Sequence, residues 1–250
     1  MKMKKIISLC LVGAMALTLL VGCGKKKEST SEKKTLVMAT NAEFPPYEYY
    51  EGKKIVGIDA EIAAGIAKEM GMKLKIEDMA FDSIIASVNS GKADFGAAGM
   101  TITEDRKQSV DFTQTYAKST QVIIVKKDSK VTKPDDLKGK KVGVQLGTTG
   151  DLYAGDIKDA TIERYNKGFE AVQSLIQGKV DAVIIDQQPA KEFVKDASSN
   201  LKILDEAFTN EEYAMAVKKG NKDLLDKMNA ALTKMKNDGS LDKIINKYIK

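Results

Sequence analysis

The spacing of hydrophobic positions changes between that of strands and that of helices several times after residue 35. Short, largely apolar runs predict buried strands at 36–39, 122–125, 141–144 and 180–185. Helical spacing of apolar residues predicts amphipathic helices at 59–70, 82–90, 168–177, 221–236 and 241–248. Asp59 is placed to cap the first of these helices, and Gly71, Gly91 and Gly178 are placed to end three of them. Strands and helices in alternation predict an α/β fold.

Two stretches far apart in the chain repeat one pattern. Residues 90–97 and 177–184 each contain the end of a helix, a Gly-Lys stop and a strand with Asp at its second position. We interpret them as matching units of two similar α/β lobes. A strand predicted at 212–217 and the two C-terminal helices are placed to return to the first lobe and cover it.

The N-terminus has the pattern of a secretion signal. Residues 1–5 are basic, and residues 6–21 form an apolar run that is short for a membrane span. The run ends in Leu20-Val21-Gly22-Cys23, which resembles the bacterial lipobox, whose cysteine is lipidated and becomes the new N-terminus. The sequence predicts a lipoprotein signal peptide at 1–22 and lipidation of Cys23. The alternative is an ordinary secretory signal that contains a cysteine.

A polar segment follows the predicted lipid site. Residues 24–34 contain no apolar side chain, so they cannot form a core, and 23–34 is predicted to be a lipidated tether. Its lysines are also suited to contact anionic lipid headgroups. Lipid, tether and soluble body together predict a protein anchored on the extracytoplasmic face of the cell membrane. Cys10 would leave with the signal peptide, so no disulfide is expected.

Composition and charge narrow the functional classes. The 250 residues are 43% hydrophobic and 30% charged, which is typical of a soluble globular protein. Of the +5 formal charge, three units belong to lysines in the first 22 residues, which leaves +2 and gives no reason to expect nucleic acid as a partner. The chain has no His, which removes the commonest general base and the commonest metal ligand. We expect no metal site, no catalytic residue and no cofactor.

Much of the candidate chemistry lies in residues 97–106, which predict a strand, a loop and a short helix. Thr103 is a good N-cap for that helix, and Gly99 allows another molecule to approach the backbone. Arg106 offers a planar fork of donors suited to a carboxylate, and Thr101 adds a hydroxyl. The stretch is either a polar cradle for a small zwitterion or a corner of the fold with a surface arginine.

Other candidate residues lie at the ends of predicted strands. The Gly147-Thr148-Thr149 loop opens a helix and presents N–H groups to an anion, but it lacks the lysine of a nucleotide-binding loop. Asp186 ends a buried strand, where it can meet an ammonium group or cap the next helix. Phe44 is held on a turn stiffened by two prolines, and Phe81 stands at a strand–helix junction.

A set of motifs in fixed order resembles the family 3 extracellular solute-binding proteins, which serve amino-acid ABC importers. The motifs are Phe44-Pro45-Pro46-Tyr47-Glu48, Val56-Gly57-Ile58-Asp59, Phe81-Asp82-Ser83-Ile84-Ile85, Gly91-Lys92-Ala93-Asp94, Gly99-Met100-Thr101-Ile102-Thr103-Glu104-Asp105-Arg106 with Val110-Asp111-Phe112, Leu137-Lys138-Gly139-Lys140-Lys141-Val142-Gly143, Gly147-Thr148-Thr149 and Asp181-Ala182-Val183-Ile184-Ile185-Asp186. The resemblance extends from about residue 36 to the C-terminus.

The resemblance implies an α/β, two-lobed periplasmic-binding-protein-like fold of type II, with the ligand cleft between the lobes. The first lobe would comprise 35–117 and 214–250, and the second 118–213. A two-strand hinge would cross near 116–120 and again near 210–213.

The resemblance also implies ligand-binding roles. Arg106, with the amides of Thr101 and Thr149, would hold the α-carboxylate of an amino acid. Asp186 would take the α-ammonium, together with the Gly99 carbonyl and the Thr101 hydroxyl. Phe44 and Phe81 would enclose the ligand side chain, and Asn41 and Gln145 would touch its end. Relatives often carry charged residues at those last two positions, whereas this chain has neutral amides. The expected ligand is therefore a polar L-amino acid, either glutamine-like or basic.

Three functions follow from these patterns. The favoured one is a monomeric receptor that captures a free amino acid and delivers it to the permease of an ABC transporter. A periplasmic cyclohexadienyl or arogenate dehydratase on the same scaffold is the enzymatic alternative, with Glu43 or Glu48 as its acid; we expect no enzyme, because nothing in the sequence marks either residue. A surface sensor or adhesin is the third.

Overall fold

The structure is a computed structural model that describes residues 34–196, 200–206 and 209–249. The predicted signal peptide, the lipidation site at Cys23 and almost all of the tether lie outside these residues. Within the described residues, no helix is both long enough and apolar enough to cross a bilayer.

The first sheet is built from segments near the beginning and the end of the described chain. Within the described residues its strand order is β5-β1-β6-β14-β7, and β1 runs parallel to β5 and β6 while β14 is antiparallel to β6 and β7. The strands are β1 (Thr35–Thr40), β5 (Lys73–Asp78), β6 (Phe95–Gly96), β7 (Val110–Phe112) and β14 (Ala216–Lys218). A small antiparallel sheet beside it comprises β2 (Glu43–Phe44), β3 (Glu48–Glu51) and β4 (Lys54–Val56).

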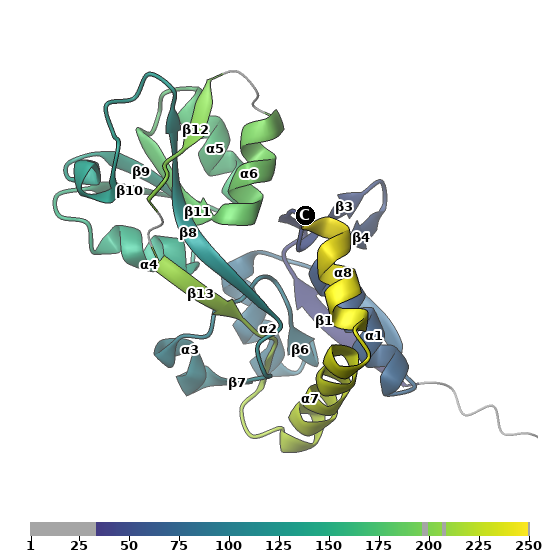
Figure 1. Ribbon diagram of the computed structural model, residues 1–250. Coiled ribbons are helices and arrows are strands. Elements are labelled where there is room, and N and C mark those ends of the chain that lie inside the picture. The colour runs from purple at the N-terminus through teal and green to yellow at the C-terminus, as the bar shows by residue number, and fades with distance from the viewer. Residues whose placement is uncertain (1–33, 197–199, 207–208, 250) are drawn as a thin grey trace, which may run out of the picture. The chain divides into compact units, whose positions relative to one another are not determined.

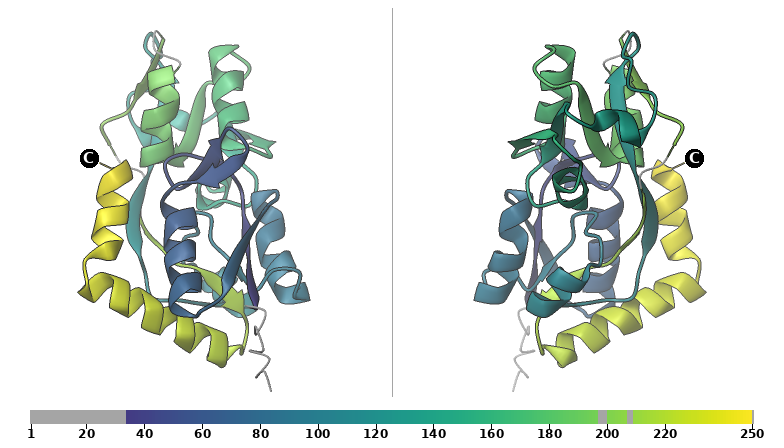
Figure 2. Two further views of the ribbon diagram at one scale, coloured as in Figure 1. Left: turned by 90° about the vertical axis from the view of Figure 1, so that its right-hand side faces the viewer. Right: turned by 90° about the vertical axis from the view of Figure 1, so that its left-hand side faces the viewer.

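Helices from both ends of the chain surround the first sheet. They are α1 (Ile58–Glu69), α2 (Ile84–Ser90) with a preceding 3-10 turn at Phe81–Ser83, α3 (Glu104–Ser109), α7 (Lys222–Asn237) and α8 (Ser240–Tyr248). The C-terminal helices α7 and α8 contact α1, and Figure 2 shows them in yellow along one side of this part of the molecule. Buried Ile62 and Ile66 of α1 share a core with Met228 and Leu232 of α7. Each such side chain stabilises the fold by roughly 1.5–3 kcal/mol when it is removed from water.

The second sheet is built from the middle of the chain. Within the described residues its order is β10-β9-β11-β8-β12, and β13 also pairs with β8. The strands are β8 (Ala117–Lys126), β9 (Lys141–Gln145), β10 (Thr161–Tyr165), β11 (Ala182–Asp186), β12 (Leu201–Ile203) and β13 (Thr209–Tyr213). The helices are α4 (Thr149–Gly155), α5 (Gly168–Ile176) and α6 (Gln187–Asp196), with a 3-10 turn at Pro134–Leu137. We refer to the parts built on the first and second sheets as the first and second lobes.

Two antiparallel strands run side by side from one lobe to the other (Figure 1). Strands β8 and β13 pair from Ala117 opposite Tyr213 to Gln121 opposite Thr209. Tyr213 also forms an isolated bridge with Thr101, and the Ala214 N–H donates to the Met100 carbonyl. The chain therefore passes between the two sheets twice within one paired ribbon.

Two predictions of local structure are wrong. Asp59 does not cap the first helix: the N-cap is Gly57, and Asp59 is fully buried inside α1, where Oδ2 accepts hydrogen bonds from the Gly99 N–H and the Tyr116 hydroxyl. Gly57 has a φ of 121°, and a Cβ there would lie 2.3 Å from the Tyr47 carbonyl oxygen, so the chain needs glycine at this entry. The strand predicted at 212–217 is divided into β13 and β14, because the chain crosses from one sheet to the other between them.

Candidate functional site

A narrow cavity lies between elements of both lobes, and we call it the central cavity. Its lining consists of Asn41, Phe44, Glu48, Phe81, Ala98, Gly99, Thr101, Arg106, Gln145, Thr148, Thr149 and Asp186. The structure therefore brings together all nine residues that the sequence pointed to as ligand contacts. That they bind a ligand stays a prediction.

Arg106 is positioned by the first turn of α3. The Thr103 hydroxyl accepts a hydrogen bond from the Arg106 N–H at 3.2 Å, which is the predicted N-cap. The guanidinium donates from Nη1 to the Thr101 carbonyl oxygen at 2.7 Å and from Nη2 to the Gly147 carbonyl oxygen at 3.0 Å, and it lies over the Phe81 ring at 5.2 Å. It forms no ion pair with any described carboxylate. A buried cation that is held by neutral carbonyl groups suits an anionic ligand group.

Asp186 ends β11, and Glu211 of β13 lies beside it. Asp186 Oδ1 accepts a hydrogen bond from the Tyr213 hydroxyl. Glu211 Oε2 accepts from the Thr101 hydroxyl at 2.8 Å and from Gln121 Nε2 at 3.1 Å. Burial, and next the negative charge of Glu211, raise the pKa of Asp186 to about 8. Burial and the neighbouring Glu211 therefore favour the protonated form of Asp186.

A second buried acid pair borders the cavity. Glu48 is 1% exposed, and neither of its carboxyl oxygens receives a hydrogen bond from a donor group among the described residues. Burial, and next the charge of Asp59, raise the pKa of Glu48 well above its usual range. Asp59 in turn holds the Gly99 N–H. Asp59 thus fixes the loop that carries Gly99.

The far end of the cavity is lined by two amides from different lobes. Gln145 Nε2 donates to Asn41 Oδ1 at 2.9 Å and to the Asn166 carbonyl at 3.1 Å, while Asn41 Nδ2 donates to the Met79 carbonyl at 2.7 Å. Because these bonds fix both amide planes, the polar atoms that a ligand side chain would meet are held in place.

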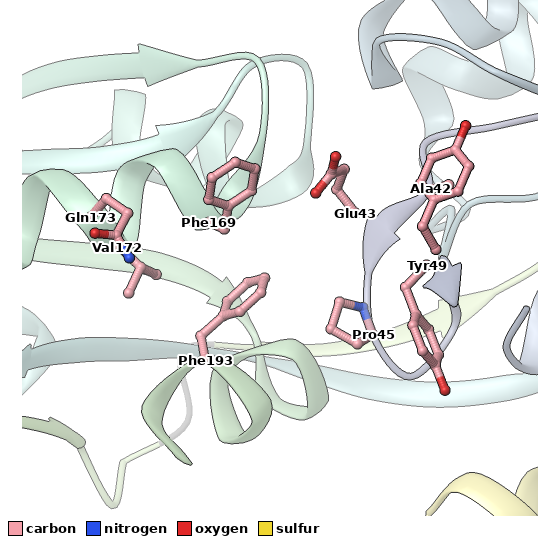
Figure 3. Close-up of a pocket in the computed structure, with 9 residues that line it drawn as sticks. Ala42, Glu43, Pro45, Tyr49, Phe169, Val172, Gln173 and Phe193 are labelled. Atoms are coloured by element: carbon pink, nitrogen blue, oxygen red, sulfur yellow. The ribbon is translucent and has the colours of Figure 1, made fainter. Parts of the chain in front are cut away.

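The rim beside these amides carries an ion pair and an open groove. Lys167 Nζ lies 2.5 Å from Glu43 Oε1, and each side chain is about one-third exposed. Figure 3 shows Glu43 and Pro45 facing Phe169 and Phe193 across the groove. Glu43 is therefore outside the central cavity, while the other candidate acid, Glu48, lines it.

Comparison with known proteins decides the family. The family model of bacterial extracellular solute-binding proteins, family 3, matches residues 36–250. The chain belongs to this family. The arginine-binding extracellular protein ArtP of Bacillus subtilis (strain 168) is 36% identical over 246 residues, which cover 96% of each chain.

Solved structures of this family-3 chain's relatives have the same fold. An ancestral arginine-binding protein bound to arginine is similar with a TM-score of 0.83 and 43% identity, covering 88% of this chain and 100% of that one. The ancestral amino acid-binding protein AncCDT-1, described as a precursor of cyclohexadienyl dehydratase, has a TM-score of 0.81 and 36% identity, covering 86% and 96%. The predicted two-lobed α/β fold is confirmed.

Sequence reasoning about this family-3 protein missed several groups behind the cavity lining. Glu211, Gln121 and Tyr213 all belong to the paired strands β8 and β13 and orient Thr101 and Asp186. Their hydrogen-bond partners lie as far as 110 residues away in the chain, so no local sequence pattern could predict these contacts. Within the described residues, no group of three or more Cys, Asp or Glu side chains is arranged to hold a metal ion.

Proposed function

We propose that this protein captures a free polar L-amino acid, glutamine-like or basic, and releases it unchanged to the permease of an ABC importer. One observation carries the proposal: a buried arginine of the first lobe and a buried aspartate of the second line the same small cavity. An α-amino acid carries two opposite charges that lose water when it is enclosed. Charge-assisted hydrogen bonds to two such groups replace that water and contribute roughly 1.5–3 kcal/mol each.

The proposed binding mode uses the observed donors and acceptors. The ligand carboxylate contacts the Arg106 guanidinium and the amides of Thr101 and Thr149. The ligand ammonium contacts Asp186, the Gly99 carbonyl and the Thr101 hydroxyl. The hydrogen of that hydroxyl is directed at Glu211, so its oxygen is left to accept from the ammonium. The ligand side chain lies between Phe44 and Phe81 and ends at the two amides.

Closure of the lobes is the second part of the proposal. The lobes comprise 35–117 with 214–250, and 118–213, and they rotate about the paired strands β8 and β13. Because Arg106 and Asp186 come from different lobes, a ligand contacts both only when the cleft is shut. The ligand therefore favours the closed state through contacts that the open state lacks.

The ligand range rests on chemistry and on relatives. Relatives are described as binding arginine, cystine, histidine or glutamine. Two aromatic rings beside fixed amides accept either an amide or a guanidinium side chain. A thermal-shift screen against the common amino acids, followed by calorimetry of each hit, tests the proposal, because a tight ligand raises the melting temperature. The proposal fails if no amino acid stabilises the protein.

Location and partners belong to the same proposal. The lipobox-like sequence before Cys23 supports a lipid anchor on the extracytoplasmic face of the cell membrane, where a monomeric receptor meets the permease. The family description as extracellular supports a site of action outside the cytoplasm.

A dehydratase is the second candidate, because Glu48, whose pKa is raised by burial, lines the central cavity. The similarity to AncCDT-1, which is described as a precursor of cyclohexadienyl dehydratase, also supports this alternative. Mass spectrometry after incubation with prephenate and with arogenate separates the two functions. A receptor returns each compound unchanged, whereas turnover that is lost in Glu48→Gln would favour the enzyme.

A further inference from the structure

We propose that Glu211 is a positioning residue that keeps a proton on Asp186 until an amino acid arrives, so that ligand binding releases this proton to solvent. The inference rests on the proposed function and deepens it, because it assigns a role to a buried acid that does not line the central cavity.

The geometry places the two acids in one buried polar cluster. Glu211 is 3% exposed and Asp186 5%, and Gln121, which donates to Glu211, lies opposite Asp186 in the register of β11 on β8. The Tyr213 hydroxyl occupies Asp186 Oδ1, and Thr101 and Gln121 occupy Glu211 Oε2. The other Glu211 oxygen, Oε1, is buried and receives no hydrogen bond from a donor group of the described residues. Because two carboxylates buried in one cluster repel each other when both are charged, the arrangement favours a proton on Asp186.

Charged and titratable groups from every neighbouring element act on this pair. They are Tyr47 before β3, Glu48 of β3, Arg106 of α3, Tyr153 of α4 and Tyr213 of β13. Arg106 is the cation among them, and its printed hydrogen bonds go to carbonyl oxygens rather than to either acid. Because the proposed function assigns Arg106 to the ligand carboxylate, Arg106 does not serve as the partner of Asp186 when both acids ionise.

The ligand ammonium supplies a positive charge at Asp186, while Arg106 neutralises the ligand carboxylate. On binding, the O–H bond of the Asp186 carboxyl breaks, its proton passes to solvent, and the carboxylate accepts an N–H of the ammonium. The ammonium keeps its own protons, and Glu211 stays bonded to Thr101 and Gln121. The protons therefore balance: the backbone of the ligand enters as a zwitterion without net charge, and the one proton lost by Asp186 passes to the solvent.

The expected consequence is an affinity that rises with pH. Below the pKa of Asp186, which is raised, the ligand must displace a proton, and affinity increases by up to about tenfold per pH unit. The rise levels off once Asp186 is ionised. Measurements between pH 5.5 and 7.5 avoid loss of the proton from the ligand's own ammonium.

The test is calorimetry at pH 6.5 in phosphate and in Tris, whose ionisation enthalpies differ, with L-arginine and L-glutamine as probes. The wild-type protein should release about one proton for each probe bound. Glu211→Gln keeps an acceptor for Thr101 but removes the charge beside Asp186, so it should release fewer protons than the wild-type protein at this pH and show a weaker pH dependence. Glu212→Gln is the matched control, since Glu212 lies on the same strand with its side chain 55% exposed and 3.8 Å from Lys118; it should behave as wild type.

The outcomes separate the two proposals. Binding of a probe without proton release, or proton release unchanged in Glu211→Gln, overturns this inference and leaves the receptor function standing. Release that disappears in Glu48→Gln but not in Glu211→Gln also overturns it, because the proton then comes from the other acid pair. Failure of both probes to bind contradicts the proposed function and this inference together.

A ligand-free measurement keeps the inference testable if Glu211→Gln alters the fold. Carbon-13 NMR of the aspartate carboxyl groups in the wild-type protein should show one group that titrates above pH 7 and is missing in Asp186→Asn. Its titration should shift to lower pH in Glu211→Gln. An Asp186 that titrates in the ordinary acidic range in the wild-type protein would overturn the inference.

Discussion

Lys167 Nζ of the second lobe lies 2.5 Å from Glu43 Oε1 of the first, at the rim of the central cavity. Lys167 immediately precedes α5, and Glu43 belongs to β2. The Asn41–Gln145 hydrogen bond lies directly inside this rim. A charged contact and an amide contact thus hold the same edge of the cleft closed.

This rim predicts a modest, salt-dependent contribution to closure. Glu43→Gln should weaken amino-acid binding by no more than about fivefold at low salt, because exposed ion pairs contribute about 0–1 kcal/mol. The double variant with Lys167→Met should weaken it no further. Calorimetry at two salt concentrations measures both, and Asp223→Asn, which removes an exposed pair within α7, is the control. A loss of a hundredfold or more in Glu43→Gln would show that Glu43 contacts the ligand.

The backbone conformation and close packing at Gly99 predict that a single added methyl group weakens ligand binding. Gly99 has a φ of 52°, and a Cβ there would lie 2.8 Å from the Phe44 ring. Gly99→Ala should therefore displace Phe44 and weaken ligand binding at least tenfold. Gly52→Ala is a matched control, with a φ of 63° and no atom within 4 Å of the added Cβ. It should lower stability by about 1 kcal/mol through backbone strain alone and leave affinity unchanged. Equal affinities of the two variants would contradict this description of the cavity wall.

Buried acids predict that the ligand-free protein loses stability as pH rises. Burial raises the pKa of Asp59 to about 6 and, with Glu211, that of Asp186 to about 8, and it also raises that of Glu48. Between pH 5 and 8 the folded protein therefore holds more protons than the unfolded chain. The free energy of unfolding falls with pH by up to about 1.4 kcal/mol per unit for each extra proton. The melting temperature should fall from pH 5 to pH 8, and less steeply in Asp186→Asn. A melting temperature that rises over this range would be inconsistent with neutral buried acids.

The lipobox-like sequence predicts that one sulfur atom retains the protein on the membrane. Cys23→Ala should release folded protein from cells, and fractionation followed by a carbonate wash measures it. Cys10→Ala, within the predicted signal peptide, serves as control and should leave the protein membrane-bound. Retention of Cys23→Ala after the wash would contradict lipidation at this position.

The fold was predictable where local pattern and packing agree. Helical spacing at 221–236 and 241–248 corresponds to α7 and α8, and Gly91 ends α2 in the left-handed conformation as expected. Asp59 was misassigned because an acid at the start of a helical pattern normally caps it. The actual entry is decided by the clash that any Cβ at Gly57 would make with Tyr47.

The residues that line the cavity were predictable from sequence motifs, but the buried residues that orient them were not. Arg106 and Thr101 lie in one short stretch, and Asp186 ends a buried strand, so local pattern marks them. Glu211 reaches Thr101 across 110 residues, and its neighbour Glu212 points to solvent. Only the register of β13 on β8 decides which of the two adjacent glutamates is buried.

Calorimetric titration of Arg106→Ala with the amino acid that most stabilises the wild-type protein tests the central claim most directly. If Arg106 holds the ligand carboxylate opposite Asp186, the variant should lose about 2–5 kcal/mol of binding free energy, and Arg106→Lys should lose a clear part of it because the planar fork is gone. The ligand-free melting temperature of each variant shows whether the fold is retained. Wild-type affinity in a folded Arg106→Ala protein would contradict the account.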